Sequence, residues 1–365
     1  MIEKYYSGVI EQIYNRIGKE TRNIVMANYS NDFSIENLEV IRRYQSNEDN
    51  VFFAYSEFSY NTLVGAYEPF LDIICNMHRH FIGGSFDDFQ KECGVYYLHR
   101  QVLNSYYETG ECFREETVLL NEVAYEQRRM TKAIVDMLKR LSEVRPLMIV
   151  INRFQMASKS SIETIKYLID NPCTNIGIVL GVNVQVKGTD STVEVWDRIV
   201  ESLEDRSAIY YIGSAGQQKN HIRDTSDDEL YITTNFEQSI QEASDIMEFL
   251  DYEQARRGCR IIEHKIKFED AWIDEKSLRR FYLIYARTSV LLGEMSKAIE
   301  LTNEYKALIP ESDSEHYFSI YYFMKGTCYM YQGKLEKAEG CAKKAYDYAL
   351  LADDELLEFK SELLS

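Results

Sequence analysis

The chain is 365 residues long, with 45% hydrophobic and 13% aromatic side chains. It is long enough for two domains, because a single core rarely extends beyond about 250–300 residues, and its aromatic content excludes an intrinsically disordered chain. With 41 Lys and Arg against 59 Asp and Glu, the formal net charge is -18. This charge argues against direct binding to nucleic acids or anionic membranes.

Residues 1–220 alternate short apolar runs with amphipathic stretches. Such runs are typical of parallel strands that are buried on both faces. The predicted strands are Asn23–Ala27, Asn50–Tyr55, Leu147–Asn152, Asn175–Val182 and Ala208–Ile212. The predicted helices are an N-terminal one with apolar residues from Ile2 to Ile17, then Ser34–Tyr44, Tyr67–Phe81, Glu115–Val144, Ser160–Ile169 and Ser191–Leu203. This alternation predicts an α/β domain with a parallel sheet.

The strand pattern ends near residue 220, and the polar residues 221–234 are a predicted linker. Residues 235–365 are helical in pattern and repeat themselves. Ala255, Ala298 and Ala338 each follow a turn and start a new helix, at intervals of about 40 residues. This periodicity predicts stacked helical hairpins, with an ordinary helical bundle as the alternative.

Residues 326–346 resemble the tetratricopeptide repeat, although the period exceeds the usual ~34 residues. Small residues in this stretch are positioned for close contact between two helices. Most tyrosines of the repeats have helical spacing and are predicted packing residues. Candidates for lining a groove that takes a peptide or a small ligand are Tyr282, Tyr285, Tyr321 and Tyr322.

The loop after the first predicted strand is where nucleotide-binding α/β folds hold phosphate. Their motif is glycine, four residues, glycine, lysine, and then serine or threonine. Here Ala27 and Asp32 replace the glycines, Phe33 replaces the lysine, and only Ser34 agrees. Asp32 adds negative charge beside the phosphates and Phe33 removes the cation, so we do not expect this loop to hold a triphosphate.

The third predicted strand and the helix after it, residues 146–168, resemble the Walker B segment of the STAND NTPases. This family of signal-transducing NTPases includes the large LuxR-type and maltose-regulator-like bacterial transcription regulators with C-terminal repeats. The chain keeps Phe154, Gln155, Ala157, Ser161 and Ile162 in register. However, Asn152 and Arg153 replace the two acids that organise magnesium and polarise the attacking water, and neither side chain can do that work. Residues 51–71 resemble the second strand of the same family and the segment after it.

The resemblance implies a degenerate P-loop NTPase-like α/β domain followed by tetratricopeptide-like helical repeats. The function it implies is a non-catalytic signalling or regulatory module, the sensory and protein-interaction part of a bacterial transcription regulator. Such a module needs no cofactor or metal and binds a protein or small-ligand partner through its repeats. Two alternatives remain open: an active ATP-binding STAND switch that uses unorthodox residues, and a pure repeat scaffold.

The N-terminus carries charges where a signal peptide requires an apolar run, and no stretch approaches the ~18 apolar residues of a membrane span. The seven cysteines form no C-x-x-C motif and are predicted to be reduced thiols. We therefore expect a cytoplasmic protein.

Residues 352–365 are amphipathic and look like the first helix of a further repeat, so we expect the repeat domain to be truncated. This helix is rich in leucine. We expect it either to pack back on the repeat that contains Ala338 or to bury its outer face in a homodimer.

Overall fold

The computed structural model describes residues 2–30, 38–45, 51–59, 63–112, 122–185, 193–206, 208–212, 236–268, 273–312 and 314–364. The chain divides into two compact units, Met1–Glu116 with Tyr125–Tyr231, and Thr117–Ala124 with Ile232–Ser365. The predicted linker, residues 221–234, lies outside the described residues. Within the described ranges, no helix is both long enough and apolar enough to cross a membrane.

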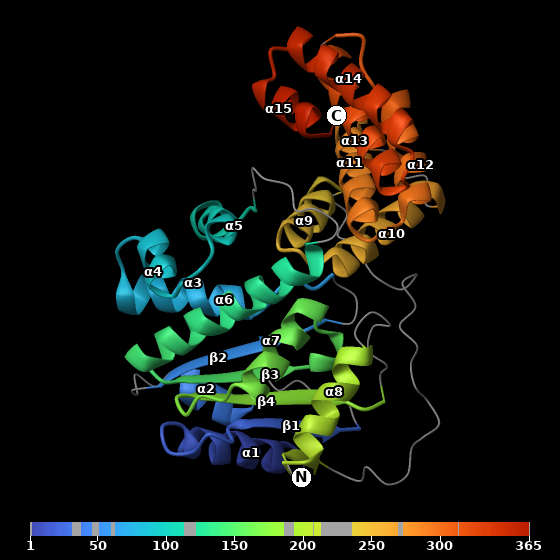
Figure 1. Ribbon diagram of the computed structural model, residues 1–365. Coiled ribbons are helices and arrows are strands. Elements are labelled where there is room, and N and C mark those ends of the chain that lie inside the picture. Colours follow the sequence, from blue (N-terminus) through green and yellow to red (C-terminus); the bar gives the residue numbers. More distant parts are fainter. Residues whose placement is uncertain are drawn as a thin grey trace. The chain divides into compact units, whose positions relative to one another are not determined.

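All the predicted strands are present in the first unit. They are β1 Ile24–Tyr29, β2 Phe52–Glu57, β3 Leu147–Asn152, β4 Ile176–Asn183 and β5 Ile209–Ile212. They form one five-stranded parallel sheet in the order β2-β3-β4-β1-β5 (Figure 1). The central strands β3 and β4 are buried along their whole length, which is why their sequences are apolar without alternation. The predicted α/β fold with a parallel sheet is confirmed.

The helices described around this sheet are α1 Ile2–Arg16, α2 Glu39–Gln45, α3 Phe70–Met77, α4 Phe86–Glu92, α5 Tyr97–Thr109, α6 Val123–Val144, α7 Lys159–Asp170 and α8 Val193–Glu204. The last turn of α3 continues as a short π-helix, His78–Ile82. Helices α4 and α5 are not predicted from the sequence. A capping signal marks α4, because the Ser85 hydroxyl accepts a hydrogen bond from the backbone N–H of Asp88 at 3.2 Å.

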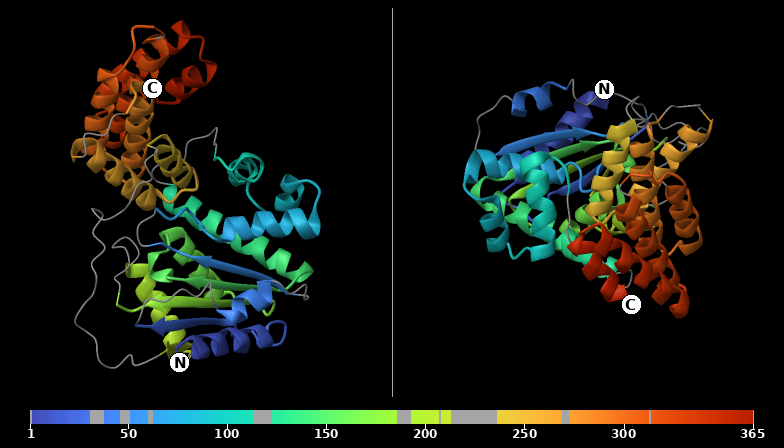
Figure 2. Two further views of the ribbon diagram at one scale, coloured as in Figure 1. Left: turned by 180° about the vertical axis from the view of Figure 1, so that it is seen from behind. Right: turned by 90° about the horizontal axis from the view of Figure 1, so that it is seen from above.

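Helices cover both faces of the sheet: α1 and α2 lie on one face, and α7 and α8 lie on the other (Figures 1 and 2). The chain crosses from β1 to β2 in one direction along the sheet and returns through β3 and β4 to β5 in the other. Right-handed crossovers therefore place these connections on opposite faces. The reversal occurs between β1 and β4, and ligands of open α/β sheets bind at the carboxyl ends of strands beside such a reversal.

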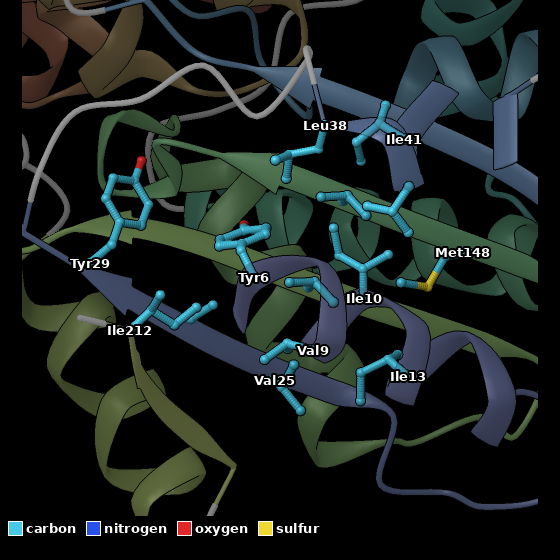
Figure 3. Close-up of a cluster of buried hydrophobic side chains, with 14 of the residues drawn as sticks. Tyr6, Val9, Ile10, Ile13, Val25, Tyr29, Leu38, Ile41, Met148 and Ile212 are labelled. Atoms are coloured by element: carbon cyan, nitrogen blue, oxygen red, sulfur yellow. The ribbon is translucent and has the colours of Figure 1, made fainter. Parts of the chain in front are cut away.

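The packing of α1 against the sheet forms a large part of the core. Tyr6, Ile10 and Ile13 are buried against residues of β1, β3 and β4 (Figure 3). Gly177 of β4 makes room for this helix, because a Cβ atom there would lie 2.8 Å from the side chain of Ile17. The apolar spacing of α1, which is evident in the sequence, thus corresponds to its buried face.

The second unit consists of helices alone. They are α9 Phe236–Glu248, α10 Tyr252–Phe268, α11 Glu275–Leu291, α12 Met295–Ala307, α13 Ser314–Tyr331, α14 Leu335–Leu351 and α15 Glu355–Leu364. The pairs α9–α10, α11–α12 and α13–α14 form hairpins, and each hairpin contacts the next. The helices are thus arranged as stacked hairpins, as the spacing predicts.

The turn within each hairpin has one residue in the left-handed region. Gly293 and Gly333 have φ values of 78° and 72°, and Leu250 occupies the same position in the first hairpin with φ 69°. Glycine adopts this conformation without steric conflict, whereas a residue with a Cβ atom is strained by about 1–2 kcal/mol. The repeated glycine in the sequence therefore reflects a backbone requirement of the turn, and Leu250 meets it at a cost.

We predict that Gly293→Ala and Gly333→Ala each lower the free energy of unfolding by about 1 kcal/mol. No atom lies within 4 Å of a Cβ at either position, so only backbone strain contributes. Gly340→Ala is the matched control, because Gly340 is exposed within α14 and also has open space around it. It should stabilise the protein by about 0.5–1 kcal/mol, since alanine favours helix. Urea unfolding measures these changes, and the same sign for all three variants would contradict the prediction.

Candidate functional site at the carboxyl edge of the sheet

The sequence places the candidate nucleotide site after β1 and β3, at the carboxyl edge of the sheet. Ala27 lies within β1, fully buried, and pairs with Gly181 of β4 and Tyr210 of β5. The strand continues to Tyr29, two residues beyond Ala27, so the position aligned with the first glycine is part of the sheet. Asp32, Phe33 and Ser34 lie outside the described residues.

Asn152 is the last residue of β3 and is completely buried. The hydroxyl of Tyr29 donates a hydrogen bond to Asn152 Oδ1 at 2.6 Å. The ring of Tyr6 from α1 packs edge-to-face against that of Tyr29, with a centroid separation of 6.3 Å. Burial raises the pKa of Tyr6 well above its ordinary value, and the neighbouring Tyr29, Tyr55 and Glu57 raise it further, so this hydroxyl stays protonated.

Gly181 of β4 provides the space in which these side chains meet. A Cβ atom at this position would collide with the Tyr6 hydroxyl and would lie 2.8 Å from Asn152 Oδ1. The absence of a side chain at position 181 therefore lets a tyrosine from α1 reach the carboxyl edge of the sheet. We call Tyr6, Tyr29 and Asn152 the edge cluster.

Arg153, the residue after β3, has a left-handed backbone with φ 54°. Its guanidinium lies 3.0 Å from Glu57 Oε1, at the end of β2, and also donates to the carbonyl oxygen of Phe58 at 3.4 Å. The other oxygen of Glu57, Oε2, accepts a hydrogen bond from the Tyr55 hydroxyl. The side chains of Arg153 and Glu57 are only 21% and 18% exposed. The positive charge that the sequence places at this edge is thus offset by a carboxylate on the neighbouring strand.

The residues that match the Walker B segment beyond Arg153 serve mainly to pack this region. Phe154, Ala157 and Ile162 are buried in the core. The Gln155 side-chain oxygen accepts a hydrogen bond from the backbone N–H of Asn183, at the end of β4, at 3.3 Å. These residues therefore attach the segment after β3 to the sheet.

Two serines at the start of α7 bind the segment that precedes α3, and a third caps the helix. Ser158, which stands where the family pattern has an acid, caps α7 by accepting from the backbone N–H of Ser161. The Ser160 hydroxyl oxygen accepts from the backbone N–H of Tyr67 at 2.9 Å. The hydroxyl of Ser161 donates to the carbonyl oxygen of Glu68 at 2.7 Å. The structure thus joins the segment before α3 to the start of α7, which lies more than 90 residues further along the chain.

Two buried side-chain donors at this edge, Asn152 Nδ2 and Gln155 Nε2, have no hydrogen-bond partner among the described residues. Nowhere in the described ranges do three or more His, Cys, Asp or Glu side chains form a group that could hold a metal ion. The cysteines are free thiols, and burial raises the pKa of Cys75 and Cys93 to about 11. These two thiols therefore remain protonated at neutral pH and are poor nucleophiles.

The tyrosines proposed for a groove in the repeats are buried or partly buried. Tyr285 and Tyr321 are each 3% exposed. Tyr285 donates to Glu263 Oε2 of α10 at 3.4 Å, and Tyr321 accepts from Lys325 Nζ at 2.6 Å. Tyr322 is partly buried and stacks on Tyr348 of α14, with centroids 5.7 Å apart. Tyr282 is also partly buried.

Three residues of this edge are not predicted from the sequence: Tyr6, Glu57 and Gly181. Glu57 gives a local signal, since it is a charged residue at the carboxyl end of β2, and ligands of open α/β sheets bind at that edge. Tyr6 gives none, because on the apolar face of α1 it looks like any other core residue.

We predict that Gly181→Ala lowers the free energy of unfolding by about 1–3 kcal/mol, the usual effect of overpacking a core. Tyr6→Phe removes the hydroxyl with which the new Cβ collides. The double variant should therefore be more stable than the sum of the two single effects implies, although Asn152 still crowds position 181. Urea unfolding of the four proteins provides the double-mutant cycle, and strict additivity would show that Tyr6 does not occupy this space.

We also predict that Arg153→Met lowers the free energy of unfolding by about 1–3 kcal/mol, because it leaves Glu57 partly buried without its cationic partner. Methionine and arginine are equally strained at φ 54°, so the backbone does not contribute. Adding Glu57→Gln should recover part of the loss. The control is Arg140→Met, which breaks an exposed pair with Glu143 and should change stability by no more than about 0.5 kcal/mol. Equal effects of Arg153→Met and Arg140→Met would contradict the prediction.

Comparison of the sequence with models of known protein families finds no match, and comparison with curated proteins finds no significant relative.

Proposed function

We propose that the chain is a non-catalytic regulatory module in which a degenerate P-loop NTPase-like unit is joined to tetratricopeptide-like repeats. The observation that carries this proposal is the set of contacts that Asn152 and Arg153 make. Both stand where the resemblance puts the acids of an NTPase, and both are engaged by other side chains of the protein.

Hydrolysis of a nucleoside triphosphate requires a magnesium ion held by protein oxygens and a group that orients the attacking water. The oxygen of Asn152 already accepts the hydrogen bond from Tyr29. Arg153 is a cation, and a cation cannot act as a base. These contacts support a unit that keeps the fold of an NTPase without its chemistry.

Glu57 is a carboxylate at this edge on which an unorthodox ATPase could rely. Its two oxygens are occupied, one by Arg153 and the other by the Tyr55 hydroxyl. Activation of a water molecule by Glu57 would require at least one of these contacts to break. The geometry therefore favours the non-catalytic proposal over this rival.

One observation favours ligand binding without hydrolysis as a second candidate function. Asn152 Nδ2 and Gln155 Nε2 are buried donors without partners among the described residues, and buried donors are usually satisfied. A small polar ligand at the carboxyl edge would supply acceptors for them, and such a ligand would serve the sensory role of a regulator.

Isothermal titration of the intact chain with Mg-ATP, combined with an assay for released phosphate, tests the proposal. We expect no phosphate release. Micromolar binding together with phosphate release would overturn the non-catalytic proposal, whereas binding alone would support the second candidate function.

We predict further that restoring the phosphate-loop residues does not create an ATPase. The variant Ala27→Gly, Asp32→Gly, Phe33→Lys regains the glycines and the lysine, but Asn152 and Arg153 still lack the metal and water chemistry. Phosphate release by this variant should equal that of the unmodified chain, with circular dichroism as the control for folding. Substantial turnover would show that β3 has been wrongly assigned to the Walker B position.

A further inference from the structure

The helical unit concentrates its exposed apolar side chains at one end. Every large hydrophobic side chain that is exposed in the described part of this unit belongs to α14 or α15: Leu335, Leu350, Leu351, Leu356, Phe359 and Leu363. None is exposed in the described residues of α9 to α13. Exposed apolar groups gathered in one region of a surface indicate an interaction site.

One side of α15 is packed on the hairpin before it (Figure 1). Ser361 is buried, and Leu364 approaches α13 so closely that its Cδ2 lies 2.8 Å from where a Cβ on Gly326 would be. The expectation that this helix packs back on the repeat containing Ala338 is therefore confirmed. In α15, Ser361 corresponds to Tyr321 of α13, about 40 residues earlier, since each is buried against the preceding hairpin.

This correspondence pairs each residue of α15 with the residue of α13 that lies 40 positions earlier. The residues of α13 that contact α14 can therefore be compared with their counterparts in α15. Ser319 donates a hydrogen bond to the carbonyl oxygen of Ala345 on α14, and the rings of Phe318 and Tyr322 stack on Tyr348 of the same helix. The corresponding residues of α15 are Glu358, Phe359 and Glu362. No second helix covers them in the described part of the chain.

These residues form a surface with a defined pattern. Leu356, Phe359 and Leu363 recur at helical spacing and are 50%, 59% and 72% exposed. The neighbouring stripe of the same helix consists of Glu355, Glu358 and Glu362, of which Glu355 and Glu362 are exposed and Glu358 is partly buried. We call the first set the apolar stripe and the second the acidic edge.

The acidic edge continues into a hollow of about 740 Å³ at the start of α15. This hollow is lined by residues 315–317 and 351–355, among them Glu315, Asp353 and Glu355. Its one imidazole, from His316, lies 3.1 Å from Asp354 Oδ2. Asp354 also accepts from the backbone N–H of Leu357, so it is engaged within the protein.

We propose that an amphipathic helix of another protein, with lysine or arginine beside its apolar face, docks on α15 in the position of a second hairpin helix. Its apolar residues cover the apolar stripe and its cations face the acidic edge. Because hairpin helices are antiparallel, the C-terminal end of the docked helix lies near the acidic hollow. Cations in the last turn of a helix are also favoured by its dipole.

Charge selects this occupant over a second copy of the chain. In an antiparallel pair of α15 helices related by a twofold axis, both acidic edges lie on the same side, so glutamates face glutamates. Where α13 meets its second helix through Phe318 and Tyr322, α15 has two glutamates. A basic helix is the complement of this surface.

The inference rests on the part of the proposed function that makes the helical unit the interaction module. It does not depend on the state of the nucleotide site. ATP hydrolysis would overturn the non-catalytic proposal without changing peptide binding, and failed peptide binding would leave the calorimetric result with Mg-ATP intact.

The test uses the full chain and two labelled peptides derived from α14, residues 335–351. One carries Glu336→Lys, Glu339→Lys and Asp347→Lys, and the other carries Lys337→Glu, Lys343→Glu and Lys344→Glu. In fluorescence anisotropy, the basic peptide should bind at least tenfold more tightly than the acidic one. The difference should shrink as salt is added.

Variants of the chain then locate the site. Phe359→Asp should weaken binding of the basic peptide at least tenfold, and Glu358→Lys with Glu362→Lys should reverse the preference between the peptides. Tyr211→Ser removes an exposed aromatic ring, and Glu108→Lys with Glu111→Lys makes the same charge change, both in the first unit. Neither control should alter binding.

Three outcomes would overturn the inference: equal affinity for both peptides, binding that Phe359→Asp leaves unchanged, or reversal of the preference by the control pair Glu108→Lys and Glu111→Lys. Sedimentation equilibrium addresses the rival occupant. A wild-type dimer that Phe359→Asp converts to a monomer would assign the surface to a second copy of the chain and would also overturn the inference.

Discussion

The hydrogen bond from the Tyr29 hydroxyl to the side-chain oxygen of Asn152 determines the polarity of the carboxyl edge of the sheet. It joins the ends of β1 and β3 through two neutral groups. A carboxylate buried in this position would need a cation or several donors to offset the cost of its desolvation. With an amide in its place, this edge contains no buried anion at the end of β3. The lack of a side chain at Gly181 lets Tyr6 of α1 add its ring to the same cluster.

The charged side chains at this edge also neutralise each other. Arg153 and Glu57 come from neighbouring parallel strands and meet at 3.0 Å, and Tyr55 occupies the second carboxylate oxygen. A partly buried pair of this kind stabilises chiefly because neither partner is left alone. The polar side chains at the end of β3 are thus engaged by neighbouring strands, Asn152 by Tyr29 of β1 and Arg153 by Glu57 of β2. These contacts support the proposal of a regulatory rather than a catalytic unit.

The helical unit is stabilised in a different way, because each hairpin packs mainly against its immediate neighbours. Its turns repeat a left-handed residue, and its second helices present small residues to their partners, such as Ala338, Ala342 and Ala345 of α14. One side of the last helix, α15, packs on the preceding hairpin, as in the other repeats. On its outer side, glutamates stand where α13 has aromatic rings. This difference underlies the proposal that a basic helix docks on the outer side of α15.

The sequence by itself determined the parallel sheet and the helical hairpins, because a run of apolar residues or a repeated turn glycine is a local property of the chain. It also identified Asn152 and Arg153, since a polar residue that ends an apolar run is visible without a structure. It missed α4, whose seven residues are too few for a clear period. Only the tertiary structure decided what Asn152 and Arg153 contact. Tyr29 lies 123 residues from Asn152 in the chain, and Tyr6 and Glu57 reach the edge only because crossovers bring distant strands together. No local pattern encodes such pairings, because they arise from the order of the strands in the sheet.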